Sequence, residues 1–148
     1  MAVTESRDLV IEATPEEIVD VLLDLESFPE WSSPHKKVEV LERDDQGRPT
    51  KSRHVVKVAG ITDEEVLAHS VYEDGVGWEL VSSKQQRGQV GRYTLTPDGD
   101  ATRVHFELMV DPTIPLPGFL VKQGAKSVMD ALTKGLRKRV LDVTKGGD

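Results

Sequence analysis

The hydrophobic positions follow a helical period at the end of the chain and a strand period through most of its middle. From Pro115 to Thr144, apolar residues recur every three or four positions, and on a helical wheel they share one arc roughly 120° wide. These residues are Val121, Ala125, Val128, Met129, Leu132, Leu136, Val140 and Val143. The pattern predicts a long C-terminal helix with one buried face, which needs a broad apolar surface to pack against.

Two glycines, Gly124 and Gly135, lie beside that arc. In the interior of a helix each costs about 1 kcal/mol relative to alanine, so their presence needs a reason. Close packing of the helix on its partner is the first interpretation. Space left for a ligand is the alternative.

The beginning of the chain predicts a strand followed by two short helices. Residues 4–13 alternate between apolar and polar positions, as in a strand. Thr14, Pro15 and Glu17 then form a capping box with proline at the first helical position, which predicts a helix start. Pro29 prevents this helix from simply continuing, so Ser27–Trp31 is expected to form a second short helix or a turn.

After Pro34 the apolar residues alternate with a period of two between turn residues, which predicts six strands. The strands are marked by Val38 and Val40, by His54 to Val58, by Leu67 to Val71, by Trp78 and Leu80, by Gly91 to Leu95, and by Val104 to Val110. Every link is short enough for a hairpin. With the first strand, this predicts an antiparallel sheet of seven strands with one buried face.

Two histidines are predicted to lie close together within this sheet. If the hairpin after Val58 turns at Ile61 and Thr62, His54 pairs with His69, and Val56 pairs with Leu67. Two imidazoles then meet on the concave face of the sheet. They are either ordinary partly buried histidines or a polar anchor or general base, the role for which histidine is suited near neutral pH.

Composition limits the classes of protein that fit. The chain has 148 residues, 37% of them hydrophobic, which suits one domain spanning residues 1–148 with a single core. Cysteine is absent, so disulfides, thiolate metal sites and a cysteine nucleophile are excluded. The N-terminal segment is polar, and no stretch approaches the roughly 18 apolar residues of a membrane span. We therefore expect a cytoplasmic protein without stable membrane insertion.

The charge is negative overall and uneven along the chain. A net charge of −7 argues against general affinity for nucleic acid. From Asp111 onward, seven basic and four acidic residues give +3, which leaves −10 for residues 1–110. The basic face of the last helix is expected to be solvated, and a transient contact with a membrane or protein partner is the alternative.

The usual catalytic signatures are missing from this sequence. There is no Gly-x-Ser-x-Gly elbow, no His-Glu-x-x-His and no phosphate-binding glycine-rich loop. The four histidines have no close metal-ligand spacing, so we expect neither a metal nor a cofactor. The strand and helix faces instead nominate residues that contact a ligand: Trp31, His54, Val56, His69, Trp78, Leu80, Tyr93, Phe106, Leu108, Val128 and Leu132.

Several segments resemble one family. Ala13–Ile18, Asp24–Trp31 and Val38–Asp44 are similar to the opening of the polyketide cyclase/dehydrase group of the START-like (SRPBCC) superfamily, which includes coenzyme Q-binding relatives. Gly91–Leu95 and Ile114–Leu120 resemble its later segments. The resemblance implies an α+β helix-grip fold, in which a curved seven-stranded antiparallel sheet wraps around the C-terminal helix and encloses a cavity.

Three functions fit this resemblance. The first is binding or transport of an apolar small molecule, such as a lipid, an isoprenoid or a polyketide-like compound, in the cavity. The second is an enzyme of the aromatase/cyclase type, and the third is a protein-partner module that uses the basic helix face. The family shares no single catalytic set, so the catalytic residues are unknown. Few ionisable or hydroxyl groups are offered to a cavity, which favours binding.

Overall fold

The computed structural model describes residues 2–113 and 115–145 and has one curved antiparallel sheet of seven strands in the order β1-β7-β6-β5-β4-β3-β2. The strands are β1 (Val3–Ile11), β2 (His35–Arg43), β3 (Pro49–Val58), β4 (Ile61–Tyr72), β5 (Gly75–Ser83), β6 (Gln86–Asp98) and β7 (Ala101–Pro112). The helix α1 (Pro15–Leu23) and the 3-10 helix η1 (Leu25–Glu30) follow β1. Met1, Ile114 and residues 146–148 of the expected domain lie outside the described residues, and Ile114 also belongs to the segment 114–120 that resembles the family.

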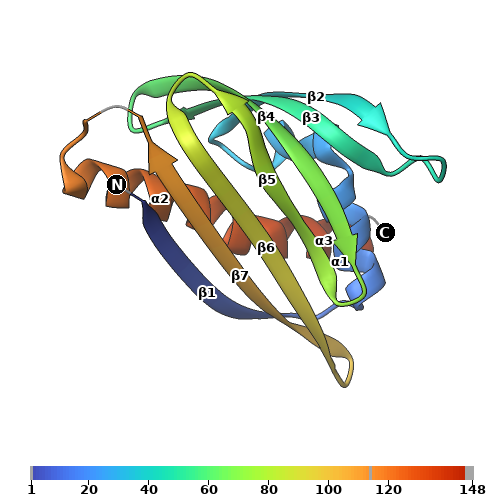
Figure 1. Ribbon diagram of the computed structural model, residues 1–148. Coiled ribbons are helices and arrows are strands. Elements are labelled where there is room, and N and C mark those ends of the chain that lie inside the picture. Colours follow the sequence, from blue (N-terminus) through green and yellow to red (C-terminus); the bar gives the residue numbers. More distant parts are fainter. Residues whose placement is uncertain (1, 114, 146–148) are drawn as a thin grey trace.

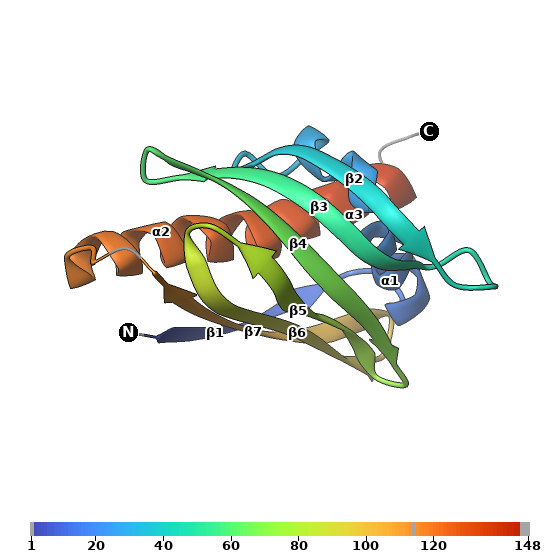
Figure 2. The same ribbon diagram turned by 45° about the horizontal axis from the view of Figure 1, so that its top comes forward.

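The C-terminal helix runs along the concave face of the sheet (Figure 1). It consists of α2 (Gly118–Asp130), a π-helical turn η2 (Ala131–Gly135) and α3 (Leu136–Thr144). Figure 2 shows β3 and β4 crossing in front of this helix, and β1 and β7 below it. This arrangement confirms the predicted α+β helix-grip architecture. No helix among the described residues is both long and apolar enough to cross a membrane.

The start of α1 has the predicted cap. The Thr14 hydroxyl accepts a hydrogen bond from the backbone N–H of Glu17 at 3.1 Å, and the Glu17 carboxylate accepts one from the backbone N–H of Thr14 at 2.9 Å. Two N–H groups that lack helical partners are thereby satisfied. Pro29 lies inside η1, which gives the predicted second short helix.

The buried face of the C-terminal helix largely follows the predicted arc. Ala125, Met129, Leu132, Leu136 and Val140 are buried in the core. Val143 departs from the prediction with 52% exposure, because the helix there has passed the end of the apolar surface. The π-helical turn was not indicated by the apolar spacing.

Both helix glycines permit close packing. A Cβ atom on Gly124 would lie 2.8 Å from Cγ1 of Val58, and one on Gly135 would lie 3.1 Å from the backbone oxygen of Trp31. A larger residue at position 124 would push the helix away from β3, and a larger residue at position 135 would push it away from Trp31, which follows η1. The packing interpretation therefore accounts for Gly135, whereas Gly124 packs on Val58 and also lines a cavity.

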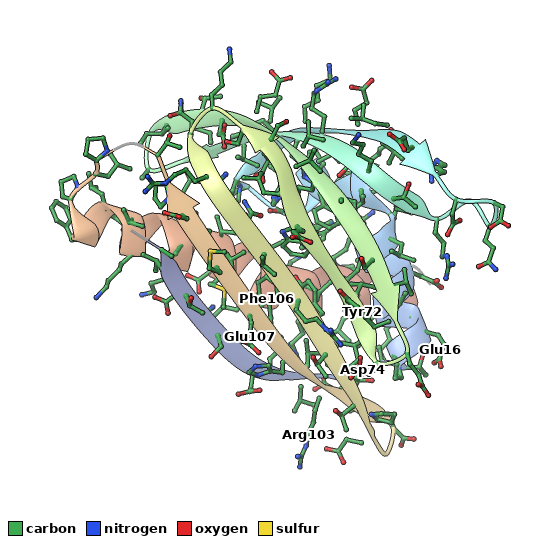
Figure 3. The ribbon with its side chains drawn as sticks, viewed as in Figure 1. Glu16, Tyr72, Asp74, Arg103, Phe106 and Glu107 are labelled. Carbon is green, nitrogen blue, oxygen red and sulfur yellow. The ribbon has the colours of Figure 1, made fainter. Side chains whose placement is uncertain are left out.

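Alternation along the strands separates the core from solvent. On β7, Phe106 is fully buried whereas its neighbours Arg103 and Glu107 are exposed on the other face (Figure 3). Phe106 stacks on Tyr93 of β6 with ring centroids 4.2 Å apart. These two rings form the centre of the core under the C-terminal helix.

The register predicted for β3 and β4 is wrong. The hairpin turns at Ala59 and Gly60, whose φ angles of 50° and 79° are those of a two-residue turn with both central residues left-handed. His54 therefore pairs with Glu65 rather than His69. The pairing moves by an even number of residues, so every side chain keeps its face. His54 and His69 still meet on the concave side.

Candidate ligand-binding cavity

A cavity of about 160 Å³ lies between the concave face of the sheet, α1, η1 and the first half of the C-terminal helix. One buried water needs roughly 10–15 Å³ of such space, so the cavity exceeds a packing defect. Its wall is mainly apolar and includes Leu22, Leu25, Phe28, Val56, Leu67, Val76, Trp78, Leu108, Val110, Leu120, Val121, Val128 and Leu132.

The cavity opens toward solvent between the β3–β4 turn and α2. Ala59 in the turn is exposed, and Leu116 and Leu120 are half-buried, and all three line the cavity. Pro112 at the end of β7 also contributes to the wall. The proline-rich segment before α2 thus borders this opening.

The nominated ligand contacts divide into two groups. Seven of them line the cavity: His54, Val56, His69, Trp78, Leu108, Val128 and Leu132. Four do not: Trp31, Leu80, Tyr93 and Phe106. The core explains the last two, because Tyr93 and Phe106 are fully buried against each other beneath the helix.

Trp31 and Leu80 do not line the cavity. Trp31 packs on Phe28 with ring centroids 4.7 Å apart and faces Gly135 on the far side of η1. Leu80 pairs with Leu67 next to a bulge in which Val81 has no partner on β4. The bulge follows Leu80, so Leu80 keeps the predicted face of β5 although it does not reach the cavity.

Three histidines form a cluster on the cavity wall, in which His35 and His54 are buried and His69 is half-buried. The hydroxyl of Ser52 lies 2.7 Å from Nε2 of His54 and 2.5 Å from Nε2 of His69. A hydroxyl has one proton, so it donates to one imidazole and accepts from the other. The ring of His35 lies 5.5 Å from that of His54, and its Nδ1 is 2.6 Å from the Ser32 hydroxyl.

Burial keeps these imidazoles neutral. Desolvation lowers the pKa of His35 to about 4 and that of His69 to about 4. The pKa of His54 falls to about 2, first through burial and then through its two histidine neighbours. Within the described part of the chain, Nδ1 of His54 has no hydrogen-bond partner although the residue is 2% exposed.

A second polar cluster joins two carboxyl groups to two amides. Asp63 Oδ2 accepts hydrogen bonds from the Ser83 hydroxyl at 2.6 Å and from the Gln86 amide at 2.8 Å. Glu65 Oε2 accepts one from the Gln89 amide at 2.9 Å, and Gln89 in turn accepts from the Trp78 indole at 2.8 Å. These bonds fix Trp78 and both acids in the wall.

The carboxyl group of Glu65 is protonated near neutral pH. Burial raises its pKa to about 8, the negative charge of Asp63 adds to the rise, and the Gln89 hydrogen bond opposes it. Oδ1 of Asp63 is buried without a partner among the described residues. The wall therefore offers a neutral carboxyl and an unused acceptor oxygen.

The acid–amide cluster was missed at the sequence level, although a signal existed. Alternation places Asp63 and Glu65 on the same face of β4 as Leu67 and His69. Acidic side chains are rarely buried, so the strand pattern was interpreted only from its apolar residues.

Residues 2–113 and 115–145, the cavity wall included, contain no group of three or more histidine or acidic side chains arranged to hold a metal ion.

Comparison with known protein families gives a match over most of the chain. The sequence profile described as polyketide cyclase/dehydrase and lipid transport matches residues 2–141. The chain belongs to this family. No curated protein sequence matches it at a significant level.

Solved structures place this polyketide cyclase/dehydrase family member in the START superfamily. A START superfamily protein from Mycobacterium smegmatis is 28% identical, with a TM-score of 0.85 over 95% of this chain and 99% of that one. A protein from Thermus thermophilus is 23% identical, with a TM-score of 0.80 over 97% and 100% of the two chains. The Zhui aromatase/cyclase from Streptomyces sp. R1128 shares the fold at 13% identity, with a TM-score of 0.82 over 99% of each chain.

Proposed function

We propose that this family member binds an apolar small molecule in the cavity, of the lipid, isoprenoid or polyketide-like kind, and carries or presents it. The observation that supports this is the cavity itself, whose wall is mainly apolar and which opens beside α2. Burial of a ligand's apolar surface contributes about 25 cal/mol per Å², less the cost of immobilising the ligand. The family description, which includes lipid transport, is consistent with this role.

An enzyme of the aromatase/cyclase type is the second candidate, because ionisable groups line the cavity. The histidines argue against strong base catalysis, since an efficient general base has a pKa near the working pH. His54, with a pKa of about 2, is a poor base. Glu65, with a pKa of about 8, has the protonation state of a general acid. Glu65 is therefore the residue whose substitution would test for catalytic turnover.

The basic helix face offers less support for a protein-partner module. Arg137 pairs with Glu12 at 2.8 Å, and Arg139 pairs with Glu30 at 3.2 Å. Lys138 pairs with Asp142 at 2.9 Å one helical turn away. Much of the cationic charge is thus balanced within the chain.

The test combines ligand identification with a cavity-filling variant. Mass spectrometry of small molecules extracted from the purified native protein identifies what the cavity holds. Val128→Phe places a larger side chain in the cavity wall, whereas Val143→Phe enlarges an exposed residue on the same helix. We expect Val128→Phe to weaken binding of apolar ligands by at least about tenfold, or 1.4 kcal/mol, and Val143→Phe to leave binding unchanged.

Two results would contradict the proposal. One is the absence of binding for a panel of fatty acyl, isoprenoid and polyketide-like compounds, followed by tryptophan fluorescence and by chemical shifts. The other is equal affinity of Val128→Phe and the unmodified protein, with both variants folded by circular dichroism. The second result would place binding elsewhere on the molecule.

A further inference from the structure

The polar part of the cavity wall contains acids but no cationic side chain. Asp63 and Glu65 both line the cavity, whereas none of the described lining residues is lysine or arginine. Lysine and arginine are rarely found in a buried wall, so the feature that distinguishes this site is the burial of two acids without a cation beside them. The three histidines of the wall are neutral because burial lowers the pKa of each.

The two acids are held in place by the fold. They are two residues apart on β4, so they point to the same concave face. Asp63 is 6% exposed and Glu65 is 4% exposed. On each carboxyl group, hydrogen bonds from β5 or β6 occupy one oxygen, namely Oδ2 of Asp63 and Oε2 of Glu65.

Two buried polar atoms of this wall have no partner in the described structure. They are Oδ1 of Asp63 and Nδ1 of His54. His54 lies opposite Glu65 in the β3–β4 pairing, and Asp63 lies one pleat further along β4. A buried polar group without a hydrogen bond costs about 1–3 kcal/mol, so these atoms mark a place where a ligand's polar end is favoured.

We propose that the cavity selects apolar molecules whose polar end is an uncharged hydrogen-bond donor, such as a hydroxyl group, and rejects carboxylates. The inference rests on the proposed ligand-binding function. A ligand hydroxyl donates its proton to Oδ1 of Asp63, an atom that can only accept when the carboxylate is ionised. A ligand carboxylate meets the negative charge of Asp63 and no cation, and a hydrogen bond from the protonated Glu65 replaces only part of its lost hydration.

The surroundings of Glu65 strengthen this selection at higher pH. The titratable groups that share the wall with it are Asp63 and His69 on β4, His54 on β3 and His35 on β2. The helix α2 faces them with Leu120, Val121, Gly124, Ala125 and Val128, none of which is charged. With a pKa of about 8, Glu65 loses its proton above that pH and adds a second negative charge to the wall.

The experiment compares three ligands of equal chain length: decan-1-ol, sodium decanoate and methyl decanoate, which is neutral but cannot donate. Trp31 lies outside the cavity, so Trp31→Phe leaves Trp78 as the sole tryptophan reporter in the wall. Near neutral pH we expect decanol to bind at least about tenfold more tightly than decanoate, and more tightly than the ester.

Asp63→Asn tests the origin of the selection. The amide keeps the shape of the carboxylate, removes its charge and can donate a hydrogen bond, so the preference for decanol over decanoate should shrink several-fold. Asp74→Asn is the matched control, because Asp74 is an exposed acid at the β4–β5 turn (Figure 3) that pairs with Arg92 at 2.8 Å. It should retain the full preference.

The outcomes separate this inference from the proposed function. If decanoate binds as tightly as decanol to the unmodified wall, head-group selection is wrong while cavity binding stands. If Asp63→Asn folds and keeps the full preference, Asp63 is not its source and the inference is overturned. If none of the three ligands binds, both the proposed function and the inference fail. The comparison of ligands on the protein with native Asp63 does not depend on the folding of any Asp63 variant.

Discussion

The hydroxyl group of Tyr93 donates a hydrogen bond of 2.6 Å to the backbone carbonyl oxygen of Leu132, and so ties the centre of the sheet to the π-helical turn. Such a turn interrupts the regular helical hydrogen-bond ladder. Tyr93 is fully buried, and burial raises the pKa of its hydroxyl well above the ordinary value, so the group remains a donor. The bond also positions Leu132 in the cavity wall.

Tyr93→Phe should destabilise the fold without changing the shape of the core. The ring and its stacking on Phe106 remain, but the carbonyl of Leu132 loses its donor in a buried site. We expect a loss of about 1–3 kcal/mol in the free energy of unfolding, measured by urea denaturation. Tyr72→Phe is the control, since Tyr72 is 43% exposed and its ring can still pack against Arg92. Equal stability of the two variants would argue against a structural role for the bond.

Much of this fold could be predicted from local chemistry. The capping box at Thr14 and the strand alternation from Val104 to Val110 depend on neighbours in the sequence, and both were read correctly. The register of β3 and β4 depended on the turn at Ala59 and Gly60, where a non-glycine residue takes a positive φ. Alanine gives no signal for that conformation, so the predicted turn was misplaced.

The site was predicted less completely than the fold. Apolar residues such as Trp78 and Val128 were assigned to the cavity from their faces alone. Asp63 and Glu65 were not, because their burial depends on hydrogen bonds from Ser83, Gln86 and Gln89, which lie 20 to 24 residues further along the chain. Long-range polar networks of this kind leave little trace in a local pattern.

Gly124→Ala should destabilise the protein although alanine favours a helix by about 1 kcal/mol. The new methyl group would lie 2.8 Å from Cγ1 of Val58, whose short branched side chain has little freedom to move. Overpacking of this kind costs about 1–3 kcal/mol. Thermal and urea unfolding would measure the change.

A double-mutant cycle identifies the clash as the cause. In the background of Val58→Ala the contacted methyl group is absent, so Gly124→Ala should become neutral or stabilising. A coupling of at least about 0.5 kcal/mol between the two positions is expected. Additive effects would show that the glycine serves another purpose.

Leu132→Asp should unfold the protein at room temperature. Leu132 is 2% exposed and lies between the core and the cavity, where an unpaired carboxylate has no partner. Lys134→Glu, two residues later, changes a side chain that is 79% exposed and lies 4.0 Å from Asp130. Its melting temperature should stay close to that of the original protein, and equal loss in both variants would contradict the assignment of the buried helix face.

Stability should pass through a maximum at a pH near 6.5, because the two buried clusters respond to pH in opposite directions. The folded pKa values of His35, His54 and His69 lie below the ordinary 6.5, at about 4, 2 and 4. As the pH falls below 6.5, the unfolded chain binds protons that the folded state excludes, so stability is lost toward acid.

Glu65 opposes the histidines between about pH 4.5 and about pH 8, and its effect dominates above the maximum. Its folded pKa of about 8 exceeds the ordinary 4.5, so the folded state holds a proton that the unfolded chain has released. Stability from this group is fully present below about pH 4.5 and is lost as the pH rises toward 8, by at most about 1.4 kcal/mol per pH unit. His105, whose pKa is raised by hydrogen bonds to Asp8 and Glu107, adds a decline of the same sign.

Glu65→Gln isolates the contribution of the buried acid to this decline. The side-chain oxygen of glutamine can still accept the hydrogen bond from the Gln89 amide, but glutamine has no carboxyl proton to lose. The fall in the free energy of unfolding between pH 6.5 and 8 should therefore become shallower. His105 is retained in this variant, and its share of the decline should persist. Glu79→Gln, on an exposed position of β5, should follow the original protein across the same range. Urea denaturation at half-unit pH steps measures all three curves, and a decline that is identical with and without Glu65 would place the responsible group outside the cavity.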